Sequence, residues 1–393
     1  MRPLEGTTVV SLEHAIAAPF ATRQLADLGA RVIKVERPLV GDFARSYDTR
    51  VSGLSSHFVW TNRSKESLTL DLKQPEALRI LKRLVLEQAD VVVQNLAPGA
   101  AARLGLSYAS LSEARPGIIV CDISGYGEDG PYRDKKAYDL LIQSEAGLVS
   151  TTGTEETPSK AGPSMADIAA GMYAYTQILV ALLHRQTTGR GQHIDISMLE
   201  SLVEWMGYPL YYAYQGAPPP PRTGASHATI YPYGPFPAGD GNTVMLGLQN
   251  EREWVAFCET ALRRPDLATD PRFAGSAARS AAREALRAII VETFAALTLA
   301  EVRARLDEAQ IANAQVNDMH QVWAHPQLRA RDRWRQIPTP AGPVPALIPP
   351  GSWEAAPPRM GGVPALGEHT GQILAGLGYD EAAIAALRAS NAI

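Results

Sequence analysis

Thr8-Val9-Val10-Ser11-Leu12 is typical of a short, buried β-strand, and this stretch decides the class of fold. Three further runs rich in Val and Ile follow it, over 32–35, 90–93 and 118–121. Segments of helical spacing separate the runs, and one of them begins at Pro75, a residue suited to a first helical turn. Continuous apolar strands that alternate with helices indicate a parallel sheet covered on both faces. The sequence therefore predicts an α/β, doubly wound fold.

The pattern changes in the middle of the chain. A proline run, Pro218 to Pro221, predicts a linker or a long excursion. The next part, 225–325, contains a strand-like stretch at 242–247 followed mostly by helical patterns. A second proline-rich stretch, 338–358, leads to a short helical segment at the end. We therefore predict a large domain over 1–215, a small domain over 225–325, and a return to the large domain over 335–393.

Length and composition exclude several classes of protein. The chain has 393 residues, 46% hydrophobic and 20% charged, which is ordinary for a globular protein of about two domains. A net charge of −4 gives no basic surface for nucleic acid. The start lacks the apolar core of a secretory signal, and the apolar run 172–183 is too short to cross a bilayer. Cys121 and Cys258 are expected to be buried thiols. We expect a cytoplasmic protein with no nucleic-acid or membrane partner.

The usual cofactor motifs are absent or out of context. Gly125-Tyr126-Gly127-Glu128-Asp129-Gly130 matches the dinucleotide fingerprint by letters, but a polar, turn-like segment follows it instead of a helix. The chain has no phosphate loop and no paired CxxC, and its histidines show no metal-ligand spacing. We therefore predict no metal and no permanently bound cofactor.

Asp167 lies at the start of a long apolar helix that ends near Gly189. Ser164, three residues before it, is typical of a helix cap, so the carboxylate belongs in the first turn. Backbone N–H groups and the helix dipole are expected to favour its ionised form there. Local sequence favours a plain cap, and the alternative is a carboxylate nucleophile.

Two other features point to ligand binding. His14 lies just past the end of the first strand, where open α/β sheets bind ligands. Arg45, Arg50, Arg63 and Lys65 lie close together in sequence. They form either a solvated loop or a site that recognises phosphate or carboxylate.

Taken in order, segments from most of the chain resemble the class III CoA-transferases, the CaiB/BaiF family of formyl-CoA, carnitine and bile-acid CoA-transferases. The matching segments are Ala18-Pro19-Phe20, 28–38, Gly41-Asp42, 62–65, 70–73, 94–99, 103–106, 124–132, 137–139, Asp167, 188–192 and 366–370.

The resemblance implies an interlocked homodimer, with a large Rossmann-like domain built from both chain ends and a smaller α+β domain. It implies that Asp167 attacks an acyl-CoA thioester, so the CoA thioester is a substrate rather than a bound cofactor. The positions that match CoA contacts of the family are Arg37, Leu70, Asp71, Leu72, Lys73, Asn95, Leu96, Ala97, Arg103, Lys136, Ala137, Tyr138 and Asp139.

The substrate region departs from the formyl-CoA enzyme at two points. Ile16 stands where that enzyme has a glutamine near the reacting centre, and the tetraglycine loop that shields its intermediate is missing. Instead, this region is most similar to the branch that uses succinyl-CoA with small dicarboxylates such as mesaconate or citramalate. Ile16, Ala17, His14 and His57 are expected near the acid. For its far carboxylate we expect Arg45 or Arg50.

Three other functions are weighed against intermolecular transfer. One is intramolecular transfer of CoA between the two carboxyls of mesaconyl-CoA. Another is α-methylacyl-CoA racemisation, which the resemblance associates with a histidine base where this chain has Tyr138. The third is non-catalytic CoA binding, which would not need Asp167.

Overall fold

The computed structural model describes residues 1–351 and 354–393, which form two compact units. The first comprises Met1–Leu148, Ala161–Tyr208 and Leu328–Ile393, and the second comprises Val149–Lys160 and Pro209–Gln327. The second unit thus begins before residue 225 and takes in a loop from the part predicted as 1–215. Arg222 accounts for this, because its guanidinium donates to the carbonyl oxygens of Ser150, Thr154 and Glu155.

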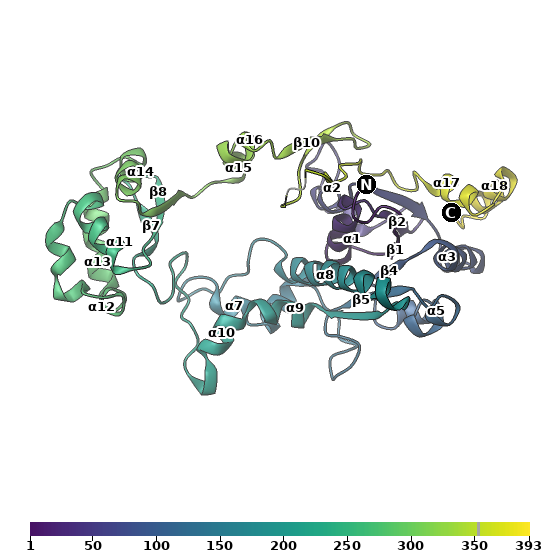
Figure 1. Ribbon diagram of the computed structural model, residues 1–393, viewed down its shortest axis with the longest axis horizontal. Coiled ribbons are helices and arrows are strands. Elements are labelled where there is room, and N and C mark those ends of the chain that lie inside the picture. The colour runs from purple at the N-terminus through teal and green to yellow at the C-terminus, as the bar shows by residue number, and fades with distance from the viewer. Residues whose placement is uncertain (352–353) are drawn as a thin grey trace. The chain divides into compact units, whose positions relative to one another are not determined.

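A six-stranded parallel sheet forms the middle of the first unit (Figure 1). Its strands are β1 (Thr8–Leu12), β2 (Arg31–Glu36), β3 (Lys65–Thr69), β4 (Val91–Gln94), β5 (Ile119–Ser124) and β6 (His193–Ser197), in the order β3-β2-β1-β4-β5-β6. The α/β class and the four predicted strands are confirmed. The two edge strands, β3 and β6, were not predicted, because polar residues interrupt the apolar pattern in their segments KESLT and HIDIS.

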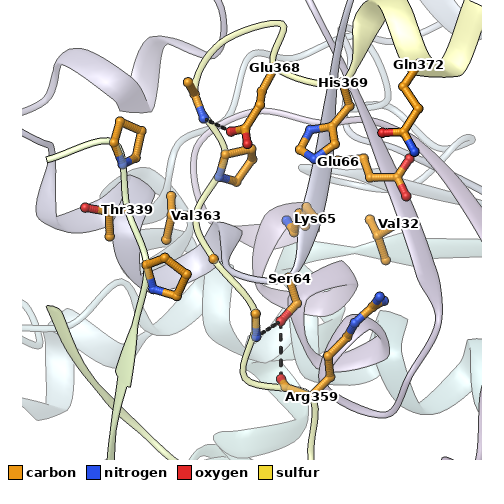
Figure 2. A pocket seen from close by; sticks show the side chains of 16 residues that line it. Val32, Ser64, Lys65, Glu66, Thr339, Arg359, Val363, Glu368, His369 and Gln372 are labelled. Atoms are coloured by element: carbon orange, nitrogen blue, oxygen red, sulfur yellow. Dashed lines mark hydrogen bonds between the residues drawn. The ribbon is translucent and has the colours of Figure 1, made fainter. Parts of the chain in front are cut away.

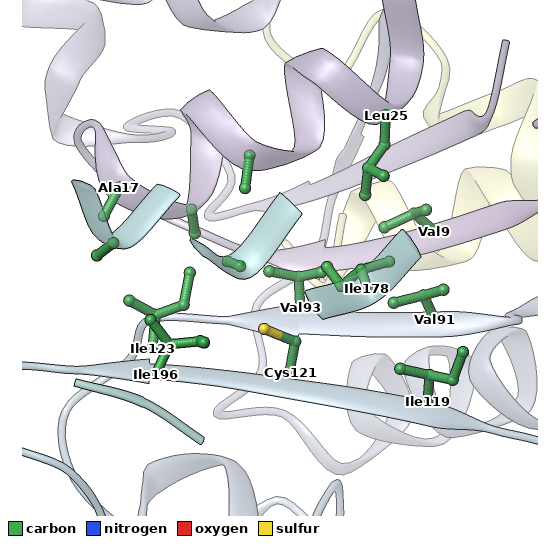
Figure 3. Packing of buried hydrophobic residues seen from close by; sticks show 14 of the residues in the cluster. Val9, Ala17, Leu25, Val91, Val93, Ile119, Cys121, Ile123, Ile178 and Ile196 are labelled. Atoms are coloured by element: carbon green, nitrogen blue, oxygen red, sulfur yellow. The ribbon is translucent and has the colours of Figure 1, made fainter. Parts of the chain in front are cut away.

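Helices cover both faces of this sheet. On one face lie α1 (Ala17–Asp27) and α8 (Met165–Thr188), and Figure 3 shows Leu25 over Val9 and Ile178 beside Val93. On the other lie α3 (Pro75–Gln88), α5 (Tyr108–Ala114), α17 (Thr370–Gly376) and α18 (Glu381–Ala389). Shorter helices are α2 (Ser56–Asn62), α4 (Ala100–Arg103), α6 (Asp139–Glu145), α7 (Leu148–Thr151), α9 (Met198–Trp205), α10 (Gly207–Tyr212), α15 (Met319–Trp323) and α16 (Pro326–Ala330).

Helix α8 agrees with the long apolar helix predicted between Ser164 and Gly189. Its 24 residues are long and apolar enough to cross a membrane by length and composition alone. One face of the helix, with Ala166, Ala170, Ala174 and Ile178, is buried in the core against α1 and the sheet. This burial is typical of the core helix of a globular protein.

The returning C-terminal segment covers the open edge of β3. The backbone N–H of Ser64 donates to the Gly362 carbonyl (2.7 Å), and that of Thr69 donates to the Thr370 hydroxyl (3.0 Å). Figure 2 shows the two hydrogen bonds of the Ser64 hydroxyl, which donates to the Arg359 carbonyl and accepts the Gly361 N–H. The proline-rich stretch before it contains an antiparallel pair, β10 (Trp334–Ile337) and β11 (Val344–Leu347). The bonds from the C-terminal segment thereby close the otherwise exposed edge of β3.

The second unit has its own core. Strands β7 (Tyr233–Pro237), β8 (Thr243–Gly247) and β9 (Ala312–Gln315) form an antiparallel sheet. Helices α11 (Glu251–Ala256), α12 (Ser276–Ala281), α13 (Arg283–Phe294) and α14 (Leu299–Glu308) accompany it. Phe236, Trp254, Phe257 and Phe294 are buried together among them.

Candidate active site

The strand order creates a switch point between β1 and β4. Chain connections leave these neighbouring strands in opposite directions, and such a point opens a crevice at the carboxyl ends of the strands. His14 follows β1 there, and Asn95 follows β4. The His14 N–H donates to the Asn95 Oδ1 (2.9 Å), and the Asn95 Nδ2 donates to the His14 carbonyl (2.9 Å). This reciprocal pair holds the two strand ends together.

Asp167 lies at the same edge of the sheet. Helix α8 ends at the opposite edge, where Arg185 bonds Asp90, the residue before β4, so its first turn is at the carboxyl edge. Gly171 is one turn after Asp167 on the same face. A Cβ at Gly171 would lie 2.7 Å from the Ala17 carbonyl oxygen, so α1 and α8 touch backbone to backbone. The Asp167 side chain is therefore beside the start of α1 and the turn that carries His14.

The protonation of Asp167 differs from the expectation. Ser164 makes no side-chain capping bond, and Asp139 instead accepts the Ala166 N–H (2.9 Å). No described donor bonds the Asp167 carboxylate, and burial followed by the negative charge of Asp139 raises its pKa to about 7. The prediction that helix donors keep Asp167 ionised was therefore wrong, because a second carboxylate takes the donor and adds like charge.

A row of aromatic and histidine rings begins at His14, and it was not predicted from the sequence. The His14 ring stacks on Phe43 (centroids 5.2 Å apart), Phe43 meets Tyr47 (5.8 Å), and Tyr47 meets the edge of His57 (5.3 Å). Burial, followed by the charges of Asp42, Asp167 and Tyr138, raises the pKa of Tyr47 to about 12. Its phenol stays protonated, and its interaction with Asp167 places it at the same site.

The six predicted substrate residues separate into different environments. Ile16 and Ala17 are buried, with 5% and 2% of each residue exposed, so neither offers much surface to a ligand in this structure. His14 is partly exposed, and its pKa is lowered by burial, which keeps the imidazole neutral. His57 is half-exposed, with Nδ1 3.4 Å from the Asp48 carboxylate.

The two candidate arginines are not equivalent. Arg45 donates from Nε and Nη2 to Glu36 (2.8 Å each), and its guanidinium lies 3.8 Å from the centre of the Phe58 ring. Its charge is thus already paired, which disagrees with a free cation for the substrate. Arg50 is exposed, and its backbone N–H donates to Asp48 (3.0 Å).

The residues that match CoA contacts gather at strand ends. Arg37 directly follows β2, Leu70 to Lys73 follow β3, and Asn95 to Ala97 follow β4. Arg103 ends the short α4, and Lys136 to Asp139 lead into α6. Because parallel strands end at one edge, the segments that follow β2, β3 and β4 share the edge with Asp167, and the bond from the Ala166 N–H brings Asp139 to the start of α8. Leu70 is buried in the core and its N–H donates to the Glu36 carbonyl, so it offers little surface to a ligand.

Two further features lie away from these residues. A cavity of about 700 Å³ runs between the starts of β2 and β3 and the returning C-terminal segment (Figure 2). Of the residues singled out from the sequence, Lys65 lines it, whereas Asp167 and the predicted CoA and acid contacts do not. Asp122, Glu128 and His193 bring one ligand atom each within 4.8 Å of one another, a cluster that sequence spacing missed. His193 pairs with both carboxylates (2.8 and 3.2 Å), so these groups satisfy one another.

Comparison with known proteins agrees with this arrangement. The sequence profile of CoA-transferase family III matches residues 4–370. Succinyl-CoA:glutarate CoA-transferase of Mus musculus is 34% identical, covering 100% of this chain and 91% of that protein. Succinyl-CoA:mesaconate CoA-transferase of Haloarcula marismortui is also 34% identical, covering 97% and 98%. A CaiB/BaiF family protein from Brucella suis superposes with a TM-score of 0.84 at 34% identity, covering 96% and 99%. The chain therefore belongs to CoA-transferase family III.

Proposed function

We propose that this protein transfers CoA from succinyl-CoA, or another short dicarboxylyl-CoA, to a small carboxylic acid through covalent intermediates on Asp167. The observation that carries the proposal is the setting of Asp167. It is a half-buried carboxylate without a bonded donor, at the switch-point edge of a parallel sheet. A capping aspartate would be engaged by helix N–H groups, and here Asp139 has that role.

The reaction exchanges carboxyl derivatives. The Asp167 carboxylate attacks the thioester carbonyl and displaces CoA thiolate, which gives a mixed anhydride. The thiolate then attacks the aspartyl carbonyl, so the donor acid leaves as its carboxylate and an aspartyl thioester remains. The acceptor carboxylate repeats the two steps in reverse, which releases its CoA ester and free Asp167. Such a near-balanced exchange needs positioning and exclusion of water.

Neighbouring groups suit this chemistry. The Tyr47 phenol, protonated at neutral pH, and the neutral His14 imidazole can donate hydrogen bonds to an acyl oxygen on Asp167. We propose that the segments at the strand ends hold CoA, with Arg37, Lys73, Arg103 and Lys136 toward its phosphates or pantetheine.

For the acceptor acid we propose a dicarboxylate whose far carboxylate pairs with Arg50. The names of the relatives support this, since they pair succinyl-CoA with glutarate or mesaconate. Arg50→Ala is expected to raise KM for glutarate about tenfold while leaving KM for butyrate unchanged, since butyrate lacks the second carboxylate. Equal effects on the two acids would contradict this role.

The function is tested by an exchange assay. Succinyl-CoA is incubated with a pool of mono- and dicarboxylic acids, and new CoA esters are identified by mass spectrometry. We expect new esters with the wild type and none with Asp167→Ala. The control is Asp266→Asn, which changes an exposed carboxylate paired with Arg264 among the described residues, and it should give wild-type yields. No ester with any acid would refute intermolecular transfer, and mesaconyl-CoA would then test intramolecular transfer.

We further propose that the enzyme acts as an interlocked homodimer in the cytoplasm. Light scattering after size exclusion tests the dimer, and a monomeric active enzyme would refute it.

A further inference from the structure

Four charged side chains are buried beneath the His14 turn. Glu13, Lys34, Asp42 and Lys65 are each at most 3% exposed. Lys34 Nζ donates to Asp42 Oδ2 (2.7 Å), and Lys65 Nζ donates to Glu13 (2.6 Å). Buried ion pairs are weak contributors to stability, because desolvation offsets their attraction. Their location under the turn suggests another role.

Asp42 is the member of this group that reaches the active-site turn. Its Oδ1 accepts the N–H of Ala15 (3.2 Å) and that of Ala44 (2.9 Å). Ala15 has a φ of 60°, in the left-handed region that residues other than glycine seldom adopt. A bond to the N–H of Ala15 therefore holds a backbone conformation that costs free energy.

The same carboxylate also places the ring beside His14. The Ala44 N–H that it accepts lies in the short helix η1 (Phe43–Ser46), whose first residue stacks on the His14 ring. The His14 Nδ1 is 3.9 Å from Asp42 Oδ1 and makes no hydrogen bond with any residue that the structure describes. One carboxylate thus fixes the backbone under His14 and the aromatic ring against it.

We propose that Asp42, anchored by Lys34, is a positioning residue that holds the His14–Ala15 turn and Phe43 in the geometry required by the acceptor acid at Asp167. This inference rests on the proposed transfer function. Asp42 touches no reacting atom and acts through His14. Lys34 keeps the carboxylate oriented, with Oδ2 inward on the ammonium and Oδ1 toward the turn.

Two double variants separate the hydrogen bond from the buried charge. Lys34→Met with Asp42→Asn and Lys34→Met with Asp42→Ala both remove the ion pair, and Glu13 keeps Lys65 in both. Only the asparagine retains an oxygen for the Ala15 and Ala44 N–H groups. We expect similar urea midpoints and a similar KM for succinyl-CoA in the two variants. The alanine variant should lose about tenfold or more in kcat/KM for the acid relative to the asparagine variant.

Equal kcat/KM for the acid in the two variants would overturn the proposal. If the methionine variants do not fold, Phe43→Ala decides, because Phe43 is 41% exposed and its loss leaves the core intact. It should raise KM for the acid and leave KM for succinyl-CoA unchanged, and an unchanged KM for the acid would overturn the proposal. Wild type and Asp167→Ala are assayed alongside. An inactive wild type would refute the transfer function, whereas an active wild type with equal variants refutes only the role of Asp42.

Discussion

Replacing Asp139 by asparagine should move the pH dependence of the enzyme. Asp139 and burial together raise the pKa of Asp167 to about 7. As the proposed nucleophile, Asp167 must be ionised to attack, so activity should rise with pH through this value. Asparagine removes the negative charge but keeps an oxygen to accept the Ala166 N–H. The pKa of Asp167 should fall, and the acid limb of the profile should move to lower pH.

The size of this change follows from the two causes. A pKa of about 7 is about three pH units above the ordinary value for aspartate, which corresponds to about 4 kcal/mol. Burial is the larger cause, so Asp139 accounts for less than half, or at most about 1.5 pH units. At pH 6 the ionised fraction of Asp167 should rise from about one tenth to at most about three quarters.

The assay is kcat/KM for the CoA ester between pH 5 and 9, because this ratio reports the free enzyme. The variant also loses the bond from the Gln143 side chain to Asp139, which costs about 1 kcal/mol of stability. Gln143→Ala, which loses that bond but keeps the charge of Asp139, is the control and should keep the wild-type profile. A limb that stays near pH 7 in Asp139→Asn, or moves upward, would refute the electrostatic reasoning.

Three further changes have defined outcomes. Asp167→Asn should stabilise the protein in thermal unfolding, by up to about 4 kcal/mol at pH 8 and less at pH 5, because the raised pKa means that ionisation destabilises the fold as pH rises through about 7. Arg45→Ala should lower the free energy of unfolding by about 3 kcal/mol at pH 7. Burial raises the pKa of Glu36, but the bonds and charge of Arg45, with the charge of Lys34 and the Ser67 bond, lower it to about 2, so the variant leaves this buried carboxylate without its salt bridge. Gly171→Ala should cost about 1–3 kcal/mol and reduce kcat, since the new Cβ meets the Ala17 carbonyl one turn from Asp167.

Each of these has a discriminating control. An Asp167→Asn effect of equal size at pH 5 and pH 8 would contradict the raised pKa. The cost of Arg45→Ala should disappear as pH falls through about 2, where Glu36 is protonated in the folded protein. Gly376→Ala, at a helical position with open space around it, should not destabilise.

Local pattern was sufficient for the four inner strands of the sheet and for the position of Asp167. Val and Ile runs such as Val9-Val10 and Val91-Val92-Val93 fill strands buried on both faces, so composition alone revealed them. The cap signal placed Asp167 in a first helical turn, as observed. The edge strands β3 and β6 escaped because polar residues interrupt their apolar pattern: Lys65 and Ser67 of β3 are buried with polar partners, whereas His193 and Asp195 of β6 are exposed.

The electrostatic state of the site depended on the tertiary structure. Asp139 and Asp167 are 28 positions apart, and only packing brings one to cap the helix of the other and raise its pKa. Arg45 is bound by Glu36 because β2 ends beside it, which its sequence neighbours do not show. Sequence thus determined which elements form and which carboxylate begins α8. Long-range packing decided the pKa of that carboxylate, and it decided that Arg45 is paired while Arg50 is exposed. Burial and charge pairing join residues that are far apart in the sequence, so no local sequence pattern predicts them.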